Sequence, residues 1–231
     1  SIIITGSSGF IGYSLAKRFL QSGFTVIGVD IMNSYYDISL KKSRLNQLKK
    51  YKKFFFHKID LCNQEKLNLI FTQYKIKYVF NLAAQAGVRY SVENPDAYFN
   101  SNILGFYSLL SSIKKFKVKY LFYASTSSVY GKQSIFPIQE KFDTNNPLSF
   151  YAATKKTNEI LADIFSKTYN INCVGLRFFT VYGPYGRPDM SLFKFVEAAL
   201  NNKKIDVYNY GKHSRDFTYV DDVTESIFKL F

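Results

Sequence analysis

Short runs of apolar, often β-branched residues alternate along this chain with longer stretches in which apolar positions recur three and four residues apart. The short runs predict buried strands, and the periodic stretches predict amphipathic helices. We expect strands at residues 2–5, 25–30, 54–59, 78–82, 120–124 and 172–177, and helices at residues 9–22, 39–49, 64–74, 100–115 and 151–169. This alternation predicts an α/β fold with a doubly wound parallel sheet and right-handed crossovers.

The pattern changes in the last quarter of the chain. A turn-rich loop at residues 183–188 is followed by an expected short helix at 191–200, an extended piece at 205–209 and a helix with Asp221 as its N-cap. We therefore expect a main domain at residues 1–176 and a partial, smaller substrate-binding region at residues 177–231. Because the sequence stops inside its last expected helix, we also expect a C-terminal segment, and a few residues before Ser1, to be missing.

The composition is that of a globular protein, with 47% hydrophobic residues in 231. No apolar run approaches the roughly 20 residues that span a bilayer. Residues 1–5 predict a first strand and not a signal peptide. Cys62 and Cys173 stand in apolar surroundings without metal-ligand spacing, so we expect two buried, reduced thiols, no metal site and a cytoplasmic protein.

The formal net charge of +14 raises the question of a nucleic-acid partner. The lysines are scattered, however, and the sequence contains no RNA- or DNA-binding motif. The chain is also rich in Lys, Asn, Ile, Phe and Tyr together, the residues that A/T-rich codons encode. Because net charge bears on solubility and association more than on fold, we expect a site for an anionic ligand and no nucleic-acid or membrane partner.

A glycine-rich turn, Thr5-Gly6-Ser7-Ser8-Gly9-Phe10-Ile11-Gly12, joins the first expected strand to the first helix. Gly6 would permit the tight turn, Gly9 the close approach of a pyrophosphate, and Gly12 the packing of helix against strand. Glycine turns alone also serve ordinary strand–helix joints. Asp30 ends the second expected strand, where an acid accepts hydrogen bonds from a ribose and repels a 2′-phosphate. This favours NAD over NADP, with simple capping of the strand as the alternative.

Other strand ends fit the same cofactor. Asp60 and Leu61 follow the third expected strand and are placed to contact adenine. Leu82, Ala83 and Ala84 end the fourth strand, where small side chains leave room for a dinucleotide. Taken singly, each of these residues is also explained by loop formation and packing. The expected cofactor contacts are completed by Phe10, Ile11, Asn102, Tyr151 and Lys155.

Tyr151 and Lys155 stand four residues apart in an expected helix, so both side chains lie on one face, one turn apart. Tyrosine has an intrinsic pKa near 10 and is a poor base at neutral pH. Lys155 and a positive nicotinamide ring would stabilise its phenolate and lower that pKa. Tyr151 would then take the proton of a substrate hydroxyl held by Thr126. The spacing alone is usually an ordinary helix turn, but together with the glycine turn it indicates nicotinamide chemistry on a hydroxyl.

With these motifs the chain resembles the extended short-chain dehydrogenases, in particular the NAD-dependent nucleotide-sugar epimerases and, among them, the UDP-glucuronate 4-epimerases. The resemblance runs the length of the chain, at residues 81–91, 151–156, 175–184, 186–190, 206–211 and 215–222. The chain departs from the family after the second strand, where Ile31 and Met32 replace more polar residues. That departure leaves Asp30 in place and alters the finer ribose contacts.

The resemblance implies a Rossmann fold and a redox-neutral reaction. Bound NAD would oxidise C4 of a UDP-sugar, the 4-keto intermediate would swing over, and hydride would return to the opposite face. Thr126, Tyr151 and Lys155 match the catalytic positions of the family. We therefore expect interconversion of UDP-glucuronate and UDP-galacturonate. The alternatives are an epimerase of neutral or N-acetylated UDP-hexoses, or an idle dinucleotide-binding protein, against which the three intact catalytic residues argue.

The family match also implies how a uronic acid is held. A 4-keto uronic acid is a β-keto acid that loses CO₂ when its carboxylate stands perpendicular to the carbonyl plane, so an epimerase must restrain it. The hydroxyls placed to do so are Thr126, Ser127, Ser128 and Thr180, with Arg187 as a nearby charge. Strand-end capping is the alternative for Ser127 and Ser128. The chain lacks the acid at position 128 expected of a decarboxylase and the Asp-Glu pair beside Thr126 expected of a 4,6-dehydratase.

The remaining expected contacts are those with UDP and with a second subunit. Arg215 suits the diphosphate, because a guanidinium matches phosphate geometry. Val207 and Tyr208 would line the uracil. Arg89 is a further candidate for an anionic contact, with an ordinary surface arginine as an equal alternative. Relatives of this fold commonly pair through two helices per subunit, here residues 100–115 and 151–169, so we expect a homodimer.

Overall fold

Six parallel strands form the main sheet of the protein, which the computed structural model describes for residues 1–212 and 214–231. The strand order is β3-β2-β1-β4-β5-β6, and it confirms the doubly wound sheet. The strands are β1 (Ile2–Thr5), β2 (Val26–Asp30), β3 (Phe54–Lys58), β4 (Tyr78–Asn81), β5 (Tyr120–Thr126) and β6 (Asn172–Phe178). Because the winding reverses between β1 and β4, the carboxyl ends of these strands diverge into a crevice.

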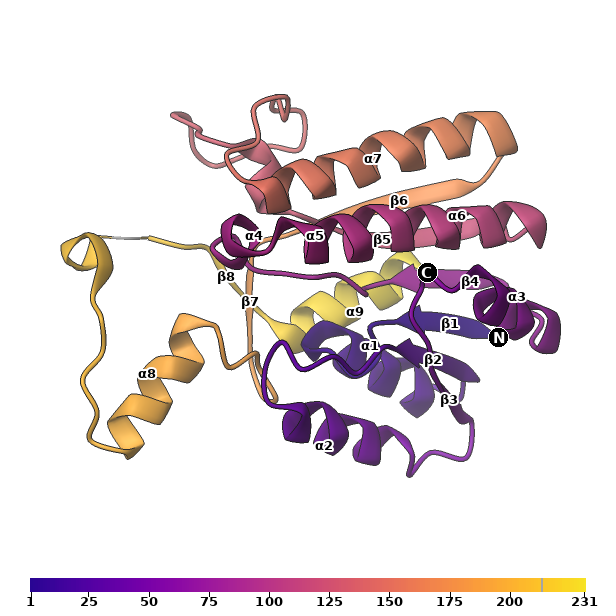
Figure 1. The fold of residues 1–231 in the computed structure, drawn as a ribbon, viewed down its shortest axis with the longest axis horizontal. Helices are drawn as coiled ribbons and strands as arrows, with labels where there is room; N and C mark the ends of the chain where they lie inside the picture. Colours follow the sequence, from indigo (N-terminus) through magenta and orange to yellow (C-terminus); the bar gives the residue numbers. More distant parts are fainter. Residues whose placement is uncertain (213) are drawn as a thin grey trace.

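Helices cover both faces of this sheet (Figure 1). One core packs the sheet against α1 (Phe10–Gln21), α2 (Ile38–Leu48) and α9 (Val220–Leu230). The other packs it against α3 (Gln64–Gln73), α6 (Gly105–Lys115) and α7 (Phe150–Tyr169). Alternate residues of β1 enter the two cores, with Ile2 and Ile4 in the first and Ile3 in the second. This two-sided burial explains why the strands are continuous apolar runs.

The C-terminal region adds a second, two-stranded parallel sheet. It pairs β7 (Thr180–Tyr182) with β8 (Phe217–Tyr219). Between them lie α8 (Ser191–Leu200) and the 3₁₀ turn η3 (Tyr208–Gly211), which Figure 1 shows to one side of the main sheet. The shorter elements nearer the main sheet are α4 (Tyr90–Glu93), α5 (Pro95–Tyr98), the π-helical η1 (Phe99–Leu104) and the 3₁₀ turn η2 (Ser127–Tyr130). The strand β6 passes the expected domain boundary at residue 176.

Three local expectations need correction. The last helix begins at Val220 rather than with Asp221 as its cap, and Asp221 lies in the first turn, where the helix dipole favours an acid. The piece at 205–209 is extended only as far as Val207, because η3 then turns with φ near +50° at Asn209 and Tyr210. The expected helix at 100–115 is π-helical over η1 before it becomes α6.

The two cysteines are less buried than expected. Cys62 is exposed and Cys173 is partly buried. Cys62 follows β3 in the turn that leads into α3, and its Sγ donates to the Asn100 carbonyl at 3.2 Å. Burial raises the pKa of both thiols to about 11. Across residues 1–212 and 214–231, none of the helices is both long and apolar enough to traverse a bilayer.

The aromatic core under α1 predicts a large loss of stability for Phe80→Ala. Phe80 is fully buried, stacks on Phe122 at 4.8 Å between ring centroids, and lies 5.0 Å from the Phe19 ring. We expect the free energy of unfolding, measured by urea denaturation, to fall by about 3–5 kcal/mol. Leu69→Ala is the control, because Leu69 is 66% exposed and its truncation leaves no cavity. Equal losses in the two variants would contradict this account of the core.

Candidate active site

A cleft of about 260 Å³ lies over the carboxyl ends of the main-sheet strands, where the winding reverses. Nearly all residues assigned to the cofactor from the sequence line it, namely Gly6, Gly9, Phe10, Ile11, Gly12, Asp30, Asp60, Leu61, Leu82, Ala83, Ala84, Tyr151 and Lys155. Thr126 and Arg187, assigned to the reaction and the substrate, line it too. The fold therefore brings the predicted cofactor turn and the predicted reacting groups to one cavity.

The glycine-rich turn packs against the end of β4 too closely for side chains. Gly6 has φ +68°, and a Cβ there would lie 2.7 Å from the Ala83 nitrogen. A Cβ on Gly12 would lie 2.1 Å from the Gly6 carbonyl oxygen. No side chain caps the following α1, whose first residues line the cleft. Its first N–H groups are therefore available to an anion, as at pyrophosphate-binding helix ends.

Asp30 braces this turn and also lines the cleft. Its carboxylate accepts hydrogen bonds from the Ser8 N–H at 2.9 Å and the Met32 N–H at 2.8 Å. Each carboxylate oxygen has further acceptor capacity for a ribose hydroxyl. Beside it, the Lys41 amine donates to the Asn33 carbonyl at 2.8 Å. Burial lowers the pKa of Lys41, and the Asp30 charge opposes that shift.

Asn102 lies behind the wall of the cleft rather than in it. Its Nδ2 donates to the Gln85 carbonyl and to the Thr154 hydroxyl, both at 3.0 Å, and its Oδ1 accepts from the Gln85 N–H at 2.8 Å. The side chain is buried and does not line the cavity. The amide thus joins η1 to α7 and to the loop after β4. Its visible role is to hold two walls of the cleft together.

The predicted reacting groups meet where α7 docks on β5. The Ser149 hydroxyl caps α7 by accepting from a first-turn N–H at 3.1 Å. Lys155 is 2% exposed, and its Nζ donates to the Ala124 carbonyl at 2.9 Å. Thr126 is the last residue of β5, which runs two residues beyond the expected strand end, and it lines the cleft together with Tyr151. A hydroxyl, a phenol and an amine are therefore held within one buried site.

The acid–base properties of this group differ from expectation. Burial raises the pKa of Tyr151, while the Arg187 charge and the hydrogen bond with Thr126 oppose the rise. Burial also lowers the pKa of Lys155 to about 8. In the protein alone, desolvation thus shifts the pKa of both groups away from the charged forms, and a lowering of the Tyr151 pKa by Lys155 together with the nicotinamide ring stays a prediction. The charge that favours the phenolate is that of Arg187.

Arg187 lies on the loop between β7 and α8 and forms a bidentate pair with Asp189. Its Nε donates to Asp189 Oδ1 at 2.9 Å, and its Nη2 donates to Oδ2. Although burial lowers the pKa of the guanidinium, the hydrogen bond and charge of Asp189 raise it above its ordinary value. Tyr35 Oη also donates to Asp189, at 3.4 Å. A partly buried cation is thus fixed in the cleft that Tyr151 lines, with its charge shared by one carboxylate.

The other predicted hydroxyls of the substrate site do not line the cleft. Ser127 and Ser128 are partly buried in η2, and the Ser128 N–H donates to Thr126 Oγ1 at 3.2 Å. Thr126 therefore caps that turn, and capping by the Ser127 and Ser128 side chains stays a prediction. Thr180 lines a neighbouring apolar cavity between β7, β8 and α8, which shares Arg187 with the main cleft.

The predicted UDP contacts lie outside the cleft on the C-terminal region and the loop before α4. The Arg89 guanidinium lies 4.1 Å from the centroid of the Tyr208 ring, which brings two of these candidates together. Val207 and Arg215 are exposed, and Arg215 Nη1 donates to the neighbouring Ser214 carbonyl. The structure thus gathers Arg89 with Tyr208 and leaves Val207 and Arg215 at the surface.

A comparison with protein families matches residues 2–231 to the NAD dependent epimerase/dehydratase family. The protein belongs to the NAD-dependent epimerase/dehydratase family. Among curated relatives, the UDP-glucuronate 4-epimerase of Thermodesulfobacterium geofontis is 47% identical over 221 residues, which are 96% of this chain and 68% of the relative. Protein CapI of Staphylococcus aureus is 52% identical over 229 residues, or 99% of this chain and 68% of the relative.

Solved structures of this epimerase/dehydratase family superpose closely. The UDP-glucuronic acid 4-epimerase of Bacillus cereus, in complex with UDP-glucuronic acid and NAD, has a TM-score of 0.91 at 35% identity, covering 98% of this chain and 71% of that one. The UDP-glucose 4-epimerase of Thermotoga maritima with UDP-glucose has a TM-score of 0.88 at 31% identity, covering 97% and 71%.

Sequence reasoning missed several residues of this epimerase/dehydratase cleft. The additional lining residues include Asn33, Tyr35, Tyr36, Lys41, Gln85, Ser101, Phe178, Phe179 and Met190. Asn33 to Lys41 follow the strand that carries Asp30, so their proximity to the ribose side could have been inferred from the βα connection. Asp189 carried a signal as well, since an acid two residues from an arginine is a natural partner for it.

The lowered pKa of Lys155 predicts a pH-dependent stability. With a pKa of about 8 in the fold against 10.5 ordinarily, the folded protein binds fewer protons than the unfolded chain between these values. The free energy of unfolding therefore gains about 3 kcal/mol from this group between pH 8 and pH 10.5, and this contribution is flat below pH 8. We expect the wild-type value minus that of Lys155→Met, from urea denaturation of cofactor-free protein, to rise across this window.

The matched control for this measurement is Lys17→Met, because Lys17 is exposed on α1. The difference between the wild type and this control should lack the rise. A Lys155→Met difference that stays constant from pH 7 to pH 10.5 would contradict the lowered pKa.

Proposed function

We propose that this protein is a UDP-glucuronate 4-epimerase, which interconverts UDP-glucuronate and UDP-galacturonate with NAD as cofactor. The observation that carries the proposal is the convergence of Tyr151, Thr126 and the partly buried Arg187 in a cleft beside the glycine-rich turn. A cation next to a proton-transferring phenol suits a sugar with a carboxylate at C6. Relatives of this activity at 47% and 44% identity support the same substrate.

The cleft fits a dinucleotide. The glycine turn lines the cleft, and its backbone is packed too closely for a Cβ at Gly6 or Gly12, so the main chain itself is presented to the cavity. Asp30 would hold the adenosine ribose and disfavour a 2′-phosphate. When bound, NAD supplies the hydride acceptor and, in the second half of the reaction, the hydride donor.

Tyr151 is the proposed proton carrier. As a phenolate it takes the proton of the C4 hydroxyl when that carbon is oxidised, and it returns the proton to the same oxygen when the 4-keto sugar is reduced on its other face. Thr126 is the proposed group that orients this hydroxyl, since it lines the cleft together with Tyr151. Arg187 favours the charged phenolate against the desolvation that raises the Tyr151 pKa. Lys155, fixed to the Ala124 carbonyl, adds a second cation whenever it is protonated.

The uronate carboxylate requires restraint because the 4-keto intermediate is a β-keto acid. In the cleft, Arg187 and Thr126 are the proposed groups that hold the carboxylate near the carbonyl plane. Asp189 already pairs with Arg187 through two hydrogen bonds. The substrate carboxylate would therefore either share the guanidinium with Asp189 or displace Asp189 from it. Ser127, Ser128 and Thr180 lie just outside the cavity and would contribute through the neighbouring turn and β7. The Arg89–Tyr208 pair and Arg215 are the proposed contacts of UDP.

The test of this function is to follow UDP-glucuronate by proton NMR, without and then with added NAD. We expect UDP-galacturonate to form without UDP-pentose. Tyr151→Phe should lower kcat by about 10²–10⁴-fold, because it removes the proton carrier. Tyr120→Phe, at the far end of the strand that ends in Thr126, is the control and should keep wild-type turnover.

Each other product gives a definite result. UDP-pentose would identify a decarboxylase and contradict the restraint assigned to Arg187 and Thr126. The protein could instead convert UDP-glucose or UDP-N-acetylglucosamine and leave UDP-glucuronate unchanged. That result would show that its substrate is a neutral UDP-sugar and would contradict the proposed uronate.

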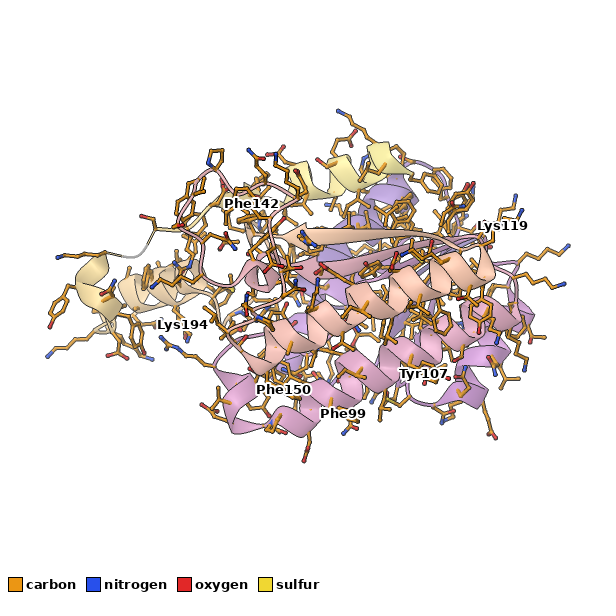
Figure 2. The ribbon with its side chains drawn as sticks, turned by 90° about the horizontal axis from the view of Figure 1, so that it is seen from above. Phe99, Tyr107, Lys119, Phe142, Phe150 and Lys194 are labelled. Carbon is orange, nitrogen blue, oxygen red and sulfur yellow. The ribbon has the colours of Figure 1, made fainter. Side chains whose placement is uncertain are left out.

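We also propose that the protein forms a homodimer through α6 and α7. These helices lie side by side, and Figure 2 looks onto them, with Tyr107 labelled on α6. They expose large apolar side chains, namely Tyr107 on α6 and Ile160, Ile164 and Tyr169 on α7, and Leu104 at the end of η1 is exposed just before α6. Two adjacent helices with one apolar face are suited to an isologous four-helix contact with a second copy, which buries this face in both subunits.

Sedimentation velocity tests the dimer. We expect a mass of about twice the 26.7 kDa of one chain, and a shift to one chain mass for Ile164→Asp, because a buried, unpaired carboxylate disfavours the contact. Leu69→Asp, on the exposed side of α3, is the control and should remain dimeric. A monomeric wild type, or an Ile164→Asp dimer of unchanged affinity, would contradict this interface.

A further inference from the structure

Arg44 on α2 is a fully buried arginine that neither the proposed reaction nor the cofactor site uses. Its exposed fraction is 0%, although arginine is among the residues least often buried. Within residues 1–212 and 214–231, no carboxylate lies within salt-bridge distance of it. A buried cation is costly unless its donors are satisfied. Its hydrogen bonds therefore show what the residue does.

The guanidinium of Arg44 bridges two sides of the cleft. Toward the glycine-rich turn, Nη1 donates to the Ser8 carbonyl at 3.0 Å and to the Tyr36 hydroxyl at 2.6 Å. Toward the loop between β7 and α8, Nε and Nη2 donate to the Tyr185 carbonyl at 3.2 and 2.6 Å, and Nη2 also donates to the Gly186 carbonyl at 3.1 Å. One side chain thus joins segments that lie more than 140 residues apart.

The bridged loop is the one that carries Arg187. Its contact with Arg44 ends at Gly186, directly before that residue. Two other contacts hold the loop against the same part of the protein. The Tyr185 ring lies 5.2 Å from the Tyr13 ring on α1, and Asp189 accepts a hydrogen bond from Tyr35. The position of the Arg187 guanidinium relative to the glycine-rich turn is therefore set through Arg44 and its neighbours.

Two other roles for Arg44 are less consistent with its contacts. A direct phosphate ligand needs donors directed at the ligand, but Nε, Nη1 and Nη2 all donate to carbonyl or hydroxyl oxygens of the protein. A simple packing role would not need a charge, and a methionine of similar length would serve it without the desolvation. The fork of the guanidinium, which reaches three segments in fixed directions, is the property that the site uses.

We infer that Arg44 is a positioning residue that couples the cofactor turn to the substrate loop, so that a ligand on the glycine-rich turn also orders the loop carrying Arg187. The consequence for the sugar rests on the proposed function, whereas the coupling itself does not. Lysine keeps the charge but offers its donors from a single nitrogen, so it cannot make the same bridge.

Amide hydrogen exchange tests the coupling with NAD as the only ligand. In the wild type, NAD should slow exchange at residues 6–12 and also at residues 183–190. In Arg44→Met and Arg44→Lys, NAD should still slow exchange at the turn, while the loop should exchange about tenfold faster than in the wild type, because hydrogen bonds to a charged donor are lost. Arg18→Met is the matched control, since Arg18 pairs with Glu225 on α9 and has no contact with the loop.

The outcomes separate cleanly. Loop protection on NAD binding that is equal in the wild type and in both variants would overturn the coupling, as would a wild-type loop that NAD does not protect. If Arg44→Met fails to fold, Arg44→Lys alone tests the coupling. Slowed amide exchange at residues 6–12 on addition of NAD would then show that this variant keeps a native cofactor site.

Kinetics add a second readout that depends on the proposed function. Arg44→Lys should raise KM for UDP-glucuronate about tenfold or more while NAD stays bound, because a substrate site that must be ordered on binding weakens affinity. An unchanged KM together with lost loop protection would overturn the link from loop order to substrate binding. Absence of any wild-type turnover would refute the proposed function, and the exchange experiment would still decide the coupling.

Discussion

The docking of α7 on the carboxyl end of β5 is the interaction on which the site depends. Tyr151, Lys155 and Glu159 follow each other at four-residue spacing, so they form one stripe that faces the sheet. Lys155 is tied to the Ala124 carbonyl, and Glu159 accepts from the Ser125 hydroxyl at 2.6 Å. These two bonds on successive strand residues fix the helix along the strand. Thr126, the next residue, lines the cleft together with Tyr151.

An ion pair beneath the site makes this docking rigid. Arg177 on β6 donates to both oxygens of Glu159, at 2.8 and 2.9 Å. Burial raises the pKa of Glu159, but the hydrogen bonds from Arg177 and Ser125 outweigh it and the net direction is downward. The carboxylate is therefore charged and satisfied near neutral pH, which a half-buried acid requires. The pair links α7, β5 and β6 but does not line the cleft. It therefore fixes the elements that carry Tyr151 and Thr126 without filling the cavity.

The parts of the fold that sequence could predict are those with a local period or a local steric demand. The strands were recognisable because burial on both faces makes them continuously apolar, and Gly6 and Gly12 because no other residue fits their backbone contacts. The Tyr151–Lys155 spacing needed only a helix. What escaped prediction depends on long-range contacts: Arg44 shows no period or motif, and its partners Tyr185 and Gly186 lie more than 140 residues away. The pKa of Tyr151 escaped for the same reason, since burial is a tertiary property.

The distribution of charge inside the cleft argues more for an anionic substrate than the charge of the whole chain does. Acids gather on the proposed ribose side, where Asp30 ends β2 and Asp60 follows β3, and only Lys41 among the lining residues there is basic. Cations gather on the reacting side, where Lys155 and Arg187 lie near Tyr151. Across the described residues, Asp189 forms an ion pair with Arg187, and no acid forms one with Lys155. The carboxylate of a uronic acid would offset the positive charge on this side of the cleft. The local field therefore distinguishes a uronic acid from a neutral hexose, whereas the net charge of +14 does not.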